Sequence, residues 1–196
     1  MKLKVSRRHS IRAAVLGRSR AGVVLSNQSD QSLCAWLPFA HLLRHAGYTV
    51  LLYDYWWGTY RSEVRAGVRK LKHRGTHRVA LVGASQGAKV AILAAGSGVH
   101  VAGVVSLSAE RYLGAVDIRR SASRLRRPII FFASEDDPWD AASAARLFYR
   151  VCPSSHKKLV MLKGDVHGID LLSGPDGPSV KQQIFDFLRT ATARKP

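Results

Sequence analysis

Short, continuously apolar segments alternate with longer amphipathic segments along this chain of 196 residues. Residues 50–53 read Val-Leu-Leu-Tyr, and residues 79–82 read Val-Ala-Leu-Val. A strand that is apolar at every position is typical of a parallel sheet covered on both faces. The alternation therefore predicts an α/β fold, a doubly wound, mostly parallel sheet of about seven strands with helices on both faces. The strands are expected at residues 11–16, 22–26, 49–54, 78–82, 101–107, 128–133 and 158–162.

The helical segments fall between these strands. They are expected at residues 35–46, 63–74, 86–95, 118–124, 141–149 and 180–190. Gly47 follows its helix as a C-terminal cap does, and Pro138 lies where a helix can begin. The length fits a single domain over residues 1–196, because domains usually contain roughly 100–200 residues. The basic segment 1–20 is expected to add an edge strand or a hairpin.

Residues 83–87 read Gly-Ala-Ser-Gln-Gly, directly between a predicted strand and a predicted helix rich in small residues. A serine on such a sharp strand-to-helix turn projects its hydroxyl above the sheet, and larger flanking side chains would collide across the turn. The helix that follows places the Gln86 N–H and a partial positive charge beside a developing oxyanion. This context predicts that Ser85 is a nucleophile, whereas a phosphate-binding turn is the alternative interpretation.

A serine nucleophile needs a base, and the base needs an acid that orients it. In this arrangement the chain order is Ser, then Asp or Glu, then His, each beyond the end of a later strand. Only His156 and His167 follow the acidic loop that comes after the strand predicted at 128–133. His156 precedes its strand and would lie at the wrong end of the sheet. His167 follows the strand predicted at 158–162, so we expect it to be the base.

Three acidic residues are candidates for the orienting acid. Asp137 is the first choice because it lies at the far end of the loop after the strand at 128–133, just before Pro138. Asp136 is the second choice. Glu110, beyond the strand predicted at 101–107, is the third. An N-terminal helix cap is the alternative role for such an acidic cluster.

With these motifs, the chain resembles the α/β-hydrolase superfamily, in particular its compact members near dienelactone hydrolases and small carboxylesterases. The resemblance runs from Gly22 to the C-terminal helix and rests on residues 83–87, 136–138 and 166–168. Residues 46–54 also resemble the helix-to-strand passage before the family's nucleophile turn. The resemblance implies a fold with little or no lid, because residues 107–128 leave room for one short helix only.

The resemblance implies a serine hydrolase that cleaves small ester or thioester substrates through an acyl-enzyme, with no metal and no cofactor. The second oxyanion donor is expected at the Gln28 N–H, or at that of Ser29, because the family's usual His-Gly is absent here. Trp56, Trp57 and Trp139 are expected to line the substrate site. Lys89 and Arg111 near the site suggest an attraction for anionic substrates. A transacylase or peptidase with the same triad is an alternative.

The charge of the chain favours a different kind of partner. Thirty-one Lys and Arg against 13 Asp and Glu give a formal net charge of +18, typical of proteins that meet nucleic acid or anionic membranes. A catalytically weak binding module for such partners is therefore the second hypothesis. The longest apolar run in the first twenty residues is 13–16, shorter than a signal peptide needs, so a cytoplasmic protein is expected. Cys34 and Cys152 lack metal-like or redox-like spacing and are expected to be free thiols.

Overall fold

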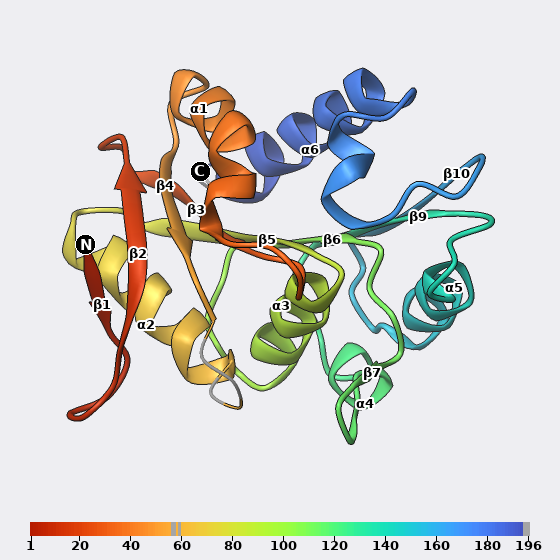
Figure 1. The fold of residues 1–196 in the computed structure, drawn as a ribbon, viewed down its shortest axis with the longest axis horizontal. Helices are drawn as coiled ribbons and strands as arrows, with labels where there is room; N and C mark the ends of the chain where they lie inside the picture. Colours follow the sequence, from red (N-terminus) through yellow and green to blue (C-terminus); the bar gives the residue numbers. More distant parts are fainter. Residues whose placement is uncertain (56–57, 59, 194–196) are drawn as a thin grey trace.

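The computed structural model describes residues 1–55, 58 and 60–193. Within this part of the chain, the main sheet has eight strands in the order β1-β2-β4-β3-β5-β6-β9-β10 (Figure 1). The strands from β4 to β10 in that order are parallel, and β1 and β2 are antiparallel to their neighbours. Their bounds are Lys2–Lys4 (β1), Ser10–Leu16 (β2), Ala21–Ser26 (β3), Thr49–Tyr53 (β4), Arg78–Ala84 (β5), Val104–Leu107 (β6), Ile129–Ser134 (β9) and Lys157–Leu162 (β10).

The sheet confirms the predicted fold class and has eight strands, where the apolar runs indicated seven. The eighth strand, β1, forms an antiparallel hairpin with β2 at one edge, within the segment 1–20 where an edge strand or a hairpin was expected. In its three residues only Leu3 is buried, between two exposed lysines. So short an element carries no periodic pattern, which is why the apolar runs did not indicate it.

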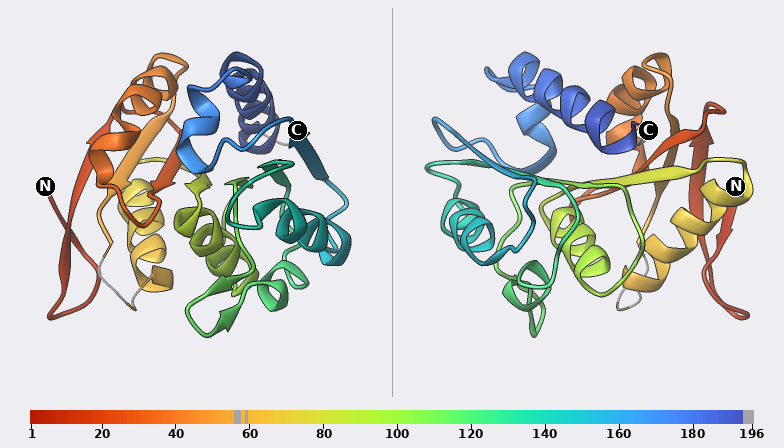
Figure 2. Two further views of the ribbon diagram at one scale, coloured as in Figure 1. Left: turned by 45° about the vertical axis from the view of Figure 1, so that its right-hand side comes forward. Right: turned by 180° about the vertical axis from the view of Figure 1, so that it is seen from behind.

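Helices cover both faces of the sheet. The views in Figures 1 and 2 place α1 and α6 on one face, and α2, α3, α4 and α5 on the other. Their bounds are Leu37–His45 (α1), Tyr60–His73 (α2), Gln86–Gly96 (α3), Arg119–Ala122 (α4), Ala141–Val151 (α5) and Gly177–Thr192 (α6). Two apolar layers result. One packs side chains such as Trp36 and Phe39 beneath α1 and α6, and the other packs residues such as Phe131 and Phe148 beneath α3 and α5. Burial on both faces explains the continuously apolar central strands.

The segment between β6 and β9 is short. It holds a hairpin of two-residue strands, β7 (Tyr112–Leu113) and β8 (Val116–Asp117), followed by α4. The sequence predicted the helix alone. The hairpin is stabilised by an ion pair from Arg111 to Asp117, whose atoms lie 3.0 Å apart.

The strand register brings several loops to one edge of the sheet. Ser26 pairs with Gly83, Ala84 pairs with Leu107, and Ser134 pairs with Leu162. The residues that follow β3, β5, β6, β9 and β10 therefore meet at the carboxyl edge, where ligands bind in open α/β sheets. No helix in the described part of the chain is both long and apolar enough to cross a membrane.

Candidate active site

Ser85 lies in a sharp turn between β5 and α3. Its backbone angles are φ 48° and ψ −116°, a strained conformation for a residue with a side chain. The flanking glycines make this turn possible. A Cβ on Gly83 would overlap the carbonyl of Gly87, and a Cβ on Gly87 would overlap the carbonyls of Ser26 and Asn27. The turn therefore has the geometry that the Gly-x-Ser-x-Gly pattern predicts.

The Ser85 hydroxyl donates a hydrogen bond to Glu110, which follows β6. Its Oγ lies 2.9 Å from Glu110 Oε1. The second carboxylate oxygen of Glu110 lies 2.8 Å from Lys89 Nζ, on the first turn of α3. The Lys89 side chain is 12% exposed, so this ion pair is well shielded from water. Ser85, Glu110 and Lys89 thus form one connected group.

Asp137 contacts the imidazole of His167. Asp137 Oδ2 lies 2.8 Å from His167 Nδ1, and Asp137 Oδ1 accepts a hydrogen bond of 2.9 Å from the Trp139 N–H. Burial of the carboxyl raises its pKa, but the His167 hydrogen bond and the Trp139 N–H outweigh this and hold the pKa below its ordinary value. An ionised Asp137 orients the ring with a proton on Nδ1, so that Nε2 is the hydrogen-bond acceptor.

The Ser85–Glu110–Lys89 group and the Asp137–His167 pair meet at one oxygen atom of Glu110. His167 Nε2 lies 3.8 Å from Glu110 Oε1, the same oxygen that accepts the Ser85 hydrogen bond. The imidazole is therefore turned toward the serine hydroxyl. In this structure the hydroxyl bonds to the carboxylate of Glu110 and makes no hydrogen bond to His167.

The three candidate acids occupy different positions. Asp137 is buried against His167. Asp136 is exposed, and its N–H bonds to the Gly164 carbonyl in the loop after β10. Glu110 lies at the serine hydroxyl. Only Asp137 reaches Nδ1 of the imidazole among the three.

Gln86 and Gln28 both lie beside the serine turn. Gln86 is the first residue of α3, and its N–H has no hydrogen-bond acceptor among the described residues. Gln28 follows β3, and its side-chain oxygen accepts a hydrogen bond of 3.0 Å from the Ile169 N–H. A Cβ on Gly168 would overlap that oxygen and lie 3.7 Å from the Ser85 Cβ, which places the Gln28 side chain close to Ser85.

Of the three tryptophans predicted to line the site, Trp56 and Trp57 lie outside the described residues. Trp139 is 64% exposed, and its ring centroid lies 6.3 Å from that of His167. Trp139 therefore presents an exposed ring beside the imidazole. The attraction for anions expected from Lys89 and Arg111 is not supported, because Glu110 and Asp117 pair with these two cations.

The sequence did not indicate the contact between Glu110 and Ser85. The one available signal was that Glu110 follows the strand next to β5. The loop that carries it begins at Ser108, whose φ of 52° lies in the left-handed region. The described residues contain no group of three His, Cys, Asp or Glu side chains able to hold a metal ion. Cys34 is an exposed free thiol and Cys152 is a buried one.

The sequence matches no protein-family model and no curated protein. Solved structures match over almost the whole chain. An esterase from Pyrococcus furiosus has a TM-score of 0.86 at 15% identity, covering 97% of this chain and 91% of that one. A dienelactone hydrolase from Anabaena variabilis has a TM-score of 0.80 at 18% identity, covering 97% and 95%.

A monoacylglycerol lipase from Paleococcus ferrophilus has a TM-score of 0.79 at 14% identity, covering 93% of this chain and 99% of that one. Each similarity spans the parallel sheet and the covering helices. The motifs at residues 83–87, 136–138 and 166–168 predict the same fold. This chain therefore has the α/β-hydrolase fold.

Proposed function

We propose that the protein is a serine hydrolase that cleaves small carboxylic esters or thioesters through an acyl-enzyme on Ser85. The observation that carries the proposal is the arrangement of the strained serine turn opposite the imidazole of His167, with Asp137 2.8 Å from the far ring nitrogen. Nucleophile, base and orienting acid are the three parts that acyl transfer by serine requires. Similarity to structures named as esterases, a lipase and a dienelactone hydrolase supports ester substrates.

In the proposed mechanism, the Ser85 hydroxyl first turns from Glu110 to His167 Nε2. The imidazole accepts the proton as Oγ attacks the substrate carbonyl, and Asp137 stabilises the imidazolium. The N–H groups of Gln86 and Gln28 hold the tetrahedral oxyanion. Collapse of this intermediate breaks the ester or thioester bond, and the leaving group takes the proton from His167. Water then loses a proton to His167 and attacks the acyl-enzyme, which releases the acid and restores the serine.

Glu110 holds the serine hydroxyl in the resting state of this mechanism. Its carboxylate is fixed by Lys89 at 2.8 Å, so the hydroxyl has a charged acceptor before substrate arrives. A substrate carbonyl at Ser85 has to exchange this hydrogen bond for one to His167. Glu110 is therefore a positioning residue, and it sets how readily the nucleophile is released.

The surroundings of Ser85 favour small or exposed acyl groups. The segment between β6 and β9 is a two-residue-strand hairpin and one short helix, which is far smaller than a lid domain. Trp139 offers an exposed apolar surface beside His167. A series of p-nitrophenyl esters with increasing acyl length tests this preference, and we expect turnover to be highest for short acyl chains.

A fluorophosphonate probe and p-nitrophenyl acetate test the reaction itself. We expect the wild-type protein to be labelled and to turn over the ester, and Ser85→Ala to do neither. Ser62→Ala, which removes an exposed hydroxyl on α2, is the matched control and should retain both activities. A folded wild-type protein that shows no labelling and no turnover contradicts the proposal. Product analysis with added alcohols and amines separates hydrolysis from acyl transfer to other acceptors.

A further inference from the structure

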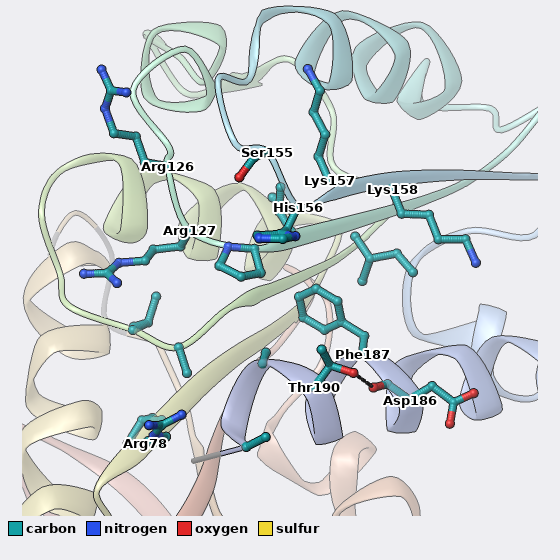
Figure 3. Close-up of a pocket in the computed structure, with 18 of the residues that line it drawn as sticks. Arg78, Arg126, Arg127, Ser155, His156, Lys157, Lys158, Asp186, Phe187 and Thr190 are labelled. Carbon is teal, nitrogen blue, oxygen red and sulfur yellow. Dashed lines mark hydrogen bonds between the residues drawn. The ribbon is translucent and has the colours of Figure 1, made fainter. Parts of the chain in front are cut away.

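A second site lies at the opposite edge of the sheet from Ser85. A cavity of about 1210 Å³ opens at the amino ends of the central and outer strands, and we call it the basic pocket. It is lined by residues at or just before the starts of β5, β6, β9 and β10, together with the ends of α2 and α6 (Figure 3). The lining includes the first residues of three strands, Arg78 (β5), Ile129 (β9) and Lys157 (β10), and Val101 just before β6. Neither Ser85 nor His167 contributes to this lining.

The described lining of the basic pocket carries six cationic side chains. They are Lys72, Arg78, Arg126, Arg127, Lys157 and Lys158. Asp186 is the only carboxylate among the described lining residues, and Arg189 already pairs with it at 2.8 Å. None of the six cations forms an ion pair with a described carboxylate. The Lys157 ammonium donates hydrogen bonds to the carbonyls of Tyr149 and Cys152, at 2.9 and 2.7 Å. No described carboxylate neutralises the positive charge of this cavity.

Contacts within the basic pocket show the effect of this charge. Arg127 Nη2 lies 2.7 Å from His100 Nε2, and a guanidinium can only donate, so this imidazole nitrogen is the acceptor. The Arg127 charge, with burial and the charge of Lys72, lowers the pKa of His100. The neutral imidazole accommodates the surrounding cations. Lys158 bonds to the neutral amide oxygen of Gln183 at 2.9 Å.

The middle of the basic pocket is apolar, with flat rings. Figure 3 shows the Phe187 ring and the His156 imidazole at the centre, with Arg78, Arg127 and Lys158 around them. A Cβ on Gly103 would lie 3.0 Å from the Phe187 ring. The absence of a side chain at Gly103 therefore allows the ring to pack closely against the backbone there. A ligand that fits carries anionic groups at its periphery and a flat, weakly polar body.

We propose that the basic pocket binds the phosphate groups of a nucleotide, either free or within a single-stranded nucleic acid. Guanidinium groups form paired hydrogen bonds to phosphate, and Arg126, Arg127 and Arg78 supply three of them around the cavity. The base lies over Phe187 and His156, in the way that bases stack on rings in single-strand grooves. The site is separate from the Ser85 site, so binding does not depend on hydrolysis.

Three probes separate the parts of this proposal: inorganic tripolyphosphate, ATP and a fluorescein-labelled oligothymidylate. Titrations of the full chain at several NaCl concentrations measure affinity and salt dependence. We expect ATP to bind more tightly than tripolyphosphate, because only ATP carries a base. ATP and the oligothymidylate are then compared at equal phosphate concentration. Tighter binding of ATP than of the oligothymidylate identifies a free nucleotide as the ligand, and the reverse order identifies a nucleic acid.

A charge-matched pair of variants locates the binding. Arg126→Glu/Arg127→Glu changes the basic pocket, and Arg7→Glu/Arg8→Glu makes the same change of charge on the exposed turn between β1 and β2. We expect the pocket variant to weaken oligothymidylate binding at least about tenfold and to reduce the salt slope by about 1.4, since each single-strand phosphate contact contributes about 0.7. The hairpin variant should change affinity less than about threefold. Both variants should turn over p-nitrophenyl acetate at the wild-type rate, which shows that they remain folded.

The base contact has its own test. Phe187→Leu removes the ring but keeps most of the volume packed against Gly103, and should weaken ATP binding without changing tripolyphosphate binding. An equal loss of affinity in both charge variants overturns the pocket as the site. Failure of all three probes to bind at about 0.1 M salt also overturns it. Equal affinities for ATP and tripolyphosphate that Phe187→Leu leaves unchanged overturn the nucleotide assignment.

Discussion

Asp136 and Asp137 are neighbours in the chain, but only Asp137 contacts the imidazole of His167. In the proposed mechanism, Asp137→Asn removes the charge that stabilises the imidazolium and favours the wrong ring tautomer. We expect kcat for p-nitrophenyl acetate to fall by about 10,000-fold. Asp136→Asn changes an exposed carboxyl and should leave kcat within about twofold. Comparable losses in the two variants contradict the assignment of Asp137.

The lowered pKa of Asp137 also affects stability at acid pH. A carboxyl whose pKa is lower in the folded state stabilises the fold above its unfolded pKa of about 3.9, and this stabilisation is lost as the pH falls through the folded pKa. Wild type should therefore be more stable than Asp137→Asn at about pH 6, and the difference should shrink toward about pH 3. Urea unfolding at a series of pH values measures it. A difference that stays constant over this range argues against the lowered pKa.

In the proposed mechanism, Glu110 holds the serine hydroxyl that His167 must accept a proton from. Glu110→Ala removes the competing acceptor, and we expect fluorophosphonate labelling to become roughly tenfold faster, since a hydrogen bond to a charged group contributes about 1.5 kcal/mol. Glu110→Gln keeps an acceptor oxygen and should show a smaller change. Lys89 loses its negatively charged partner in both variants, so Glu110→Ala/Lys89→Met controls for an uncompensated buried charge. Slower labelling in Glu110→Ala shows instead that the carboxylate assists proton transfer.

The sequence predicted the order of Ser85, Asp137 and His167 because each follows the end of a parallel strand, and parallel strands end at one edge. It did not resolve which carboxyl meets the imidazole. That choice depends on the turn after β9, where the Asp137 carboxylate accepts a hydrogen bond from the Trp139 N–H. Nor did it predict the bond from Ser85 to Glu110, because this contact depends on the left-handed backbone at Ser108.

At the scale of elements, the approach of α3 to β3 determines the position of the serine. The first turn of α3 lies against the end of β3, where a Cβ on Gly87 would overlap two backbone carbonyls. Gly87→Ala has to move the helix, because backbone atoms cannot rotate away. We expect it to lower the free energy of unfolding by about 3 kcal/mol or more and to abolish labelling of Ser85.

Gly67→Ala on α2 is the matched control for this element. Its Cβ would meet side-chain methyl groups of Leu51 and Val24 at 3.3 to 3.5 Å, and alanine is the better helix former. Its stability should stay within about 1 kcal/mol of wild type. Chemical unfolding of both variants makes the comparison. A Gly87→Ala protein that keeps full stability and labelling contradicts the proposed packing constraint.

The strands and helices were predictable where their patterns extend over several residues. Strands of five to seven residues such as β4 and β5 are buried along nearly their whole length and were visible as apolar runs. The two-residue strands β7 and β8 are too short for any period and were missed. The strand predicted at 101–107 begins only at Val104. Ala102 and Gly103 already bond to the backbone of β5, so the sequence placed the start of this strand a few residues early.

For the whole molecule, the net charge of +18 opposes compactness. Raising NaCl from about 0.1 M to about 1 M shortens the Debye length from about 10 Å to about 3 Å and screens this repulsion. We expect the melting temperature to rise over this range. Tripolyphosphate at matched ionic strength should raise it further, because a ligand that binds the folded state adds stability. A fall in melting temperature with NaCl shows that attractive ion pairs outweigh the repulsion.

Both outer strands of the sheet begin with lysine. β1 is only three residues long and carries Lys2 and Lys4, while β10 starts with Lys157 and Lys158. Unpaired strand edges are the places where two copies of a chain can join into a continuous sheet. Two such edges would bring like charges together, and this repulsion disfavours the pairing. We therefore expect the lysines at the sheet margins to disfavour aggregation through strand edges, and for Lys2 and Lys4 this use of positive charge is separate from the basic pocket.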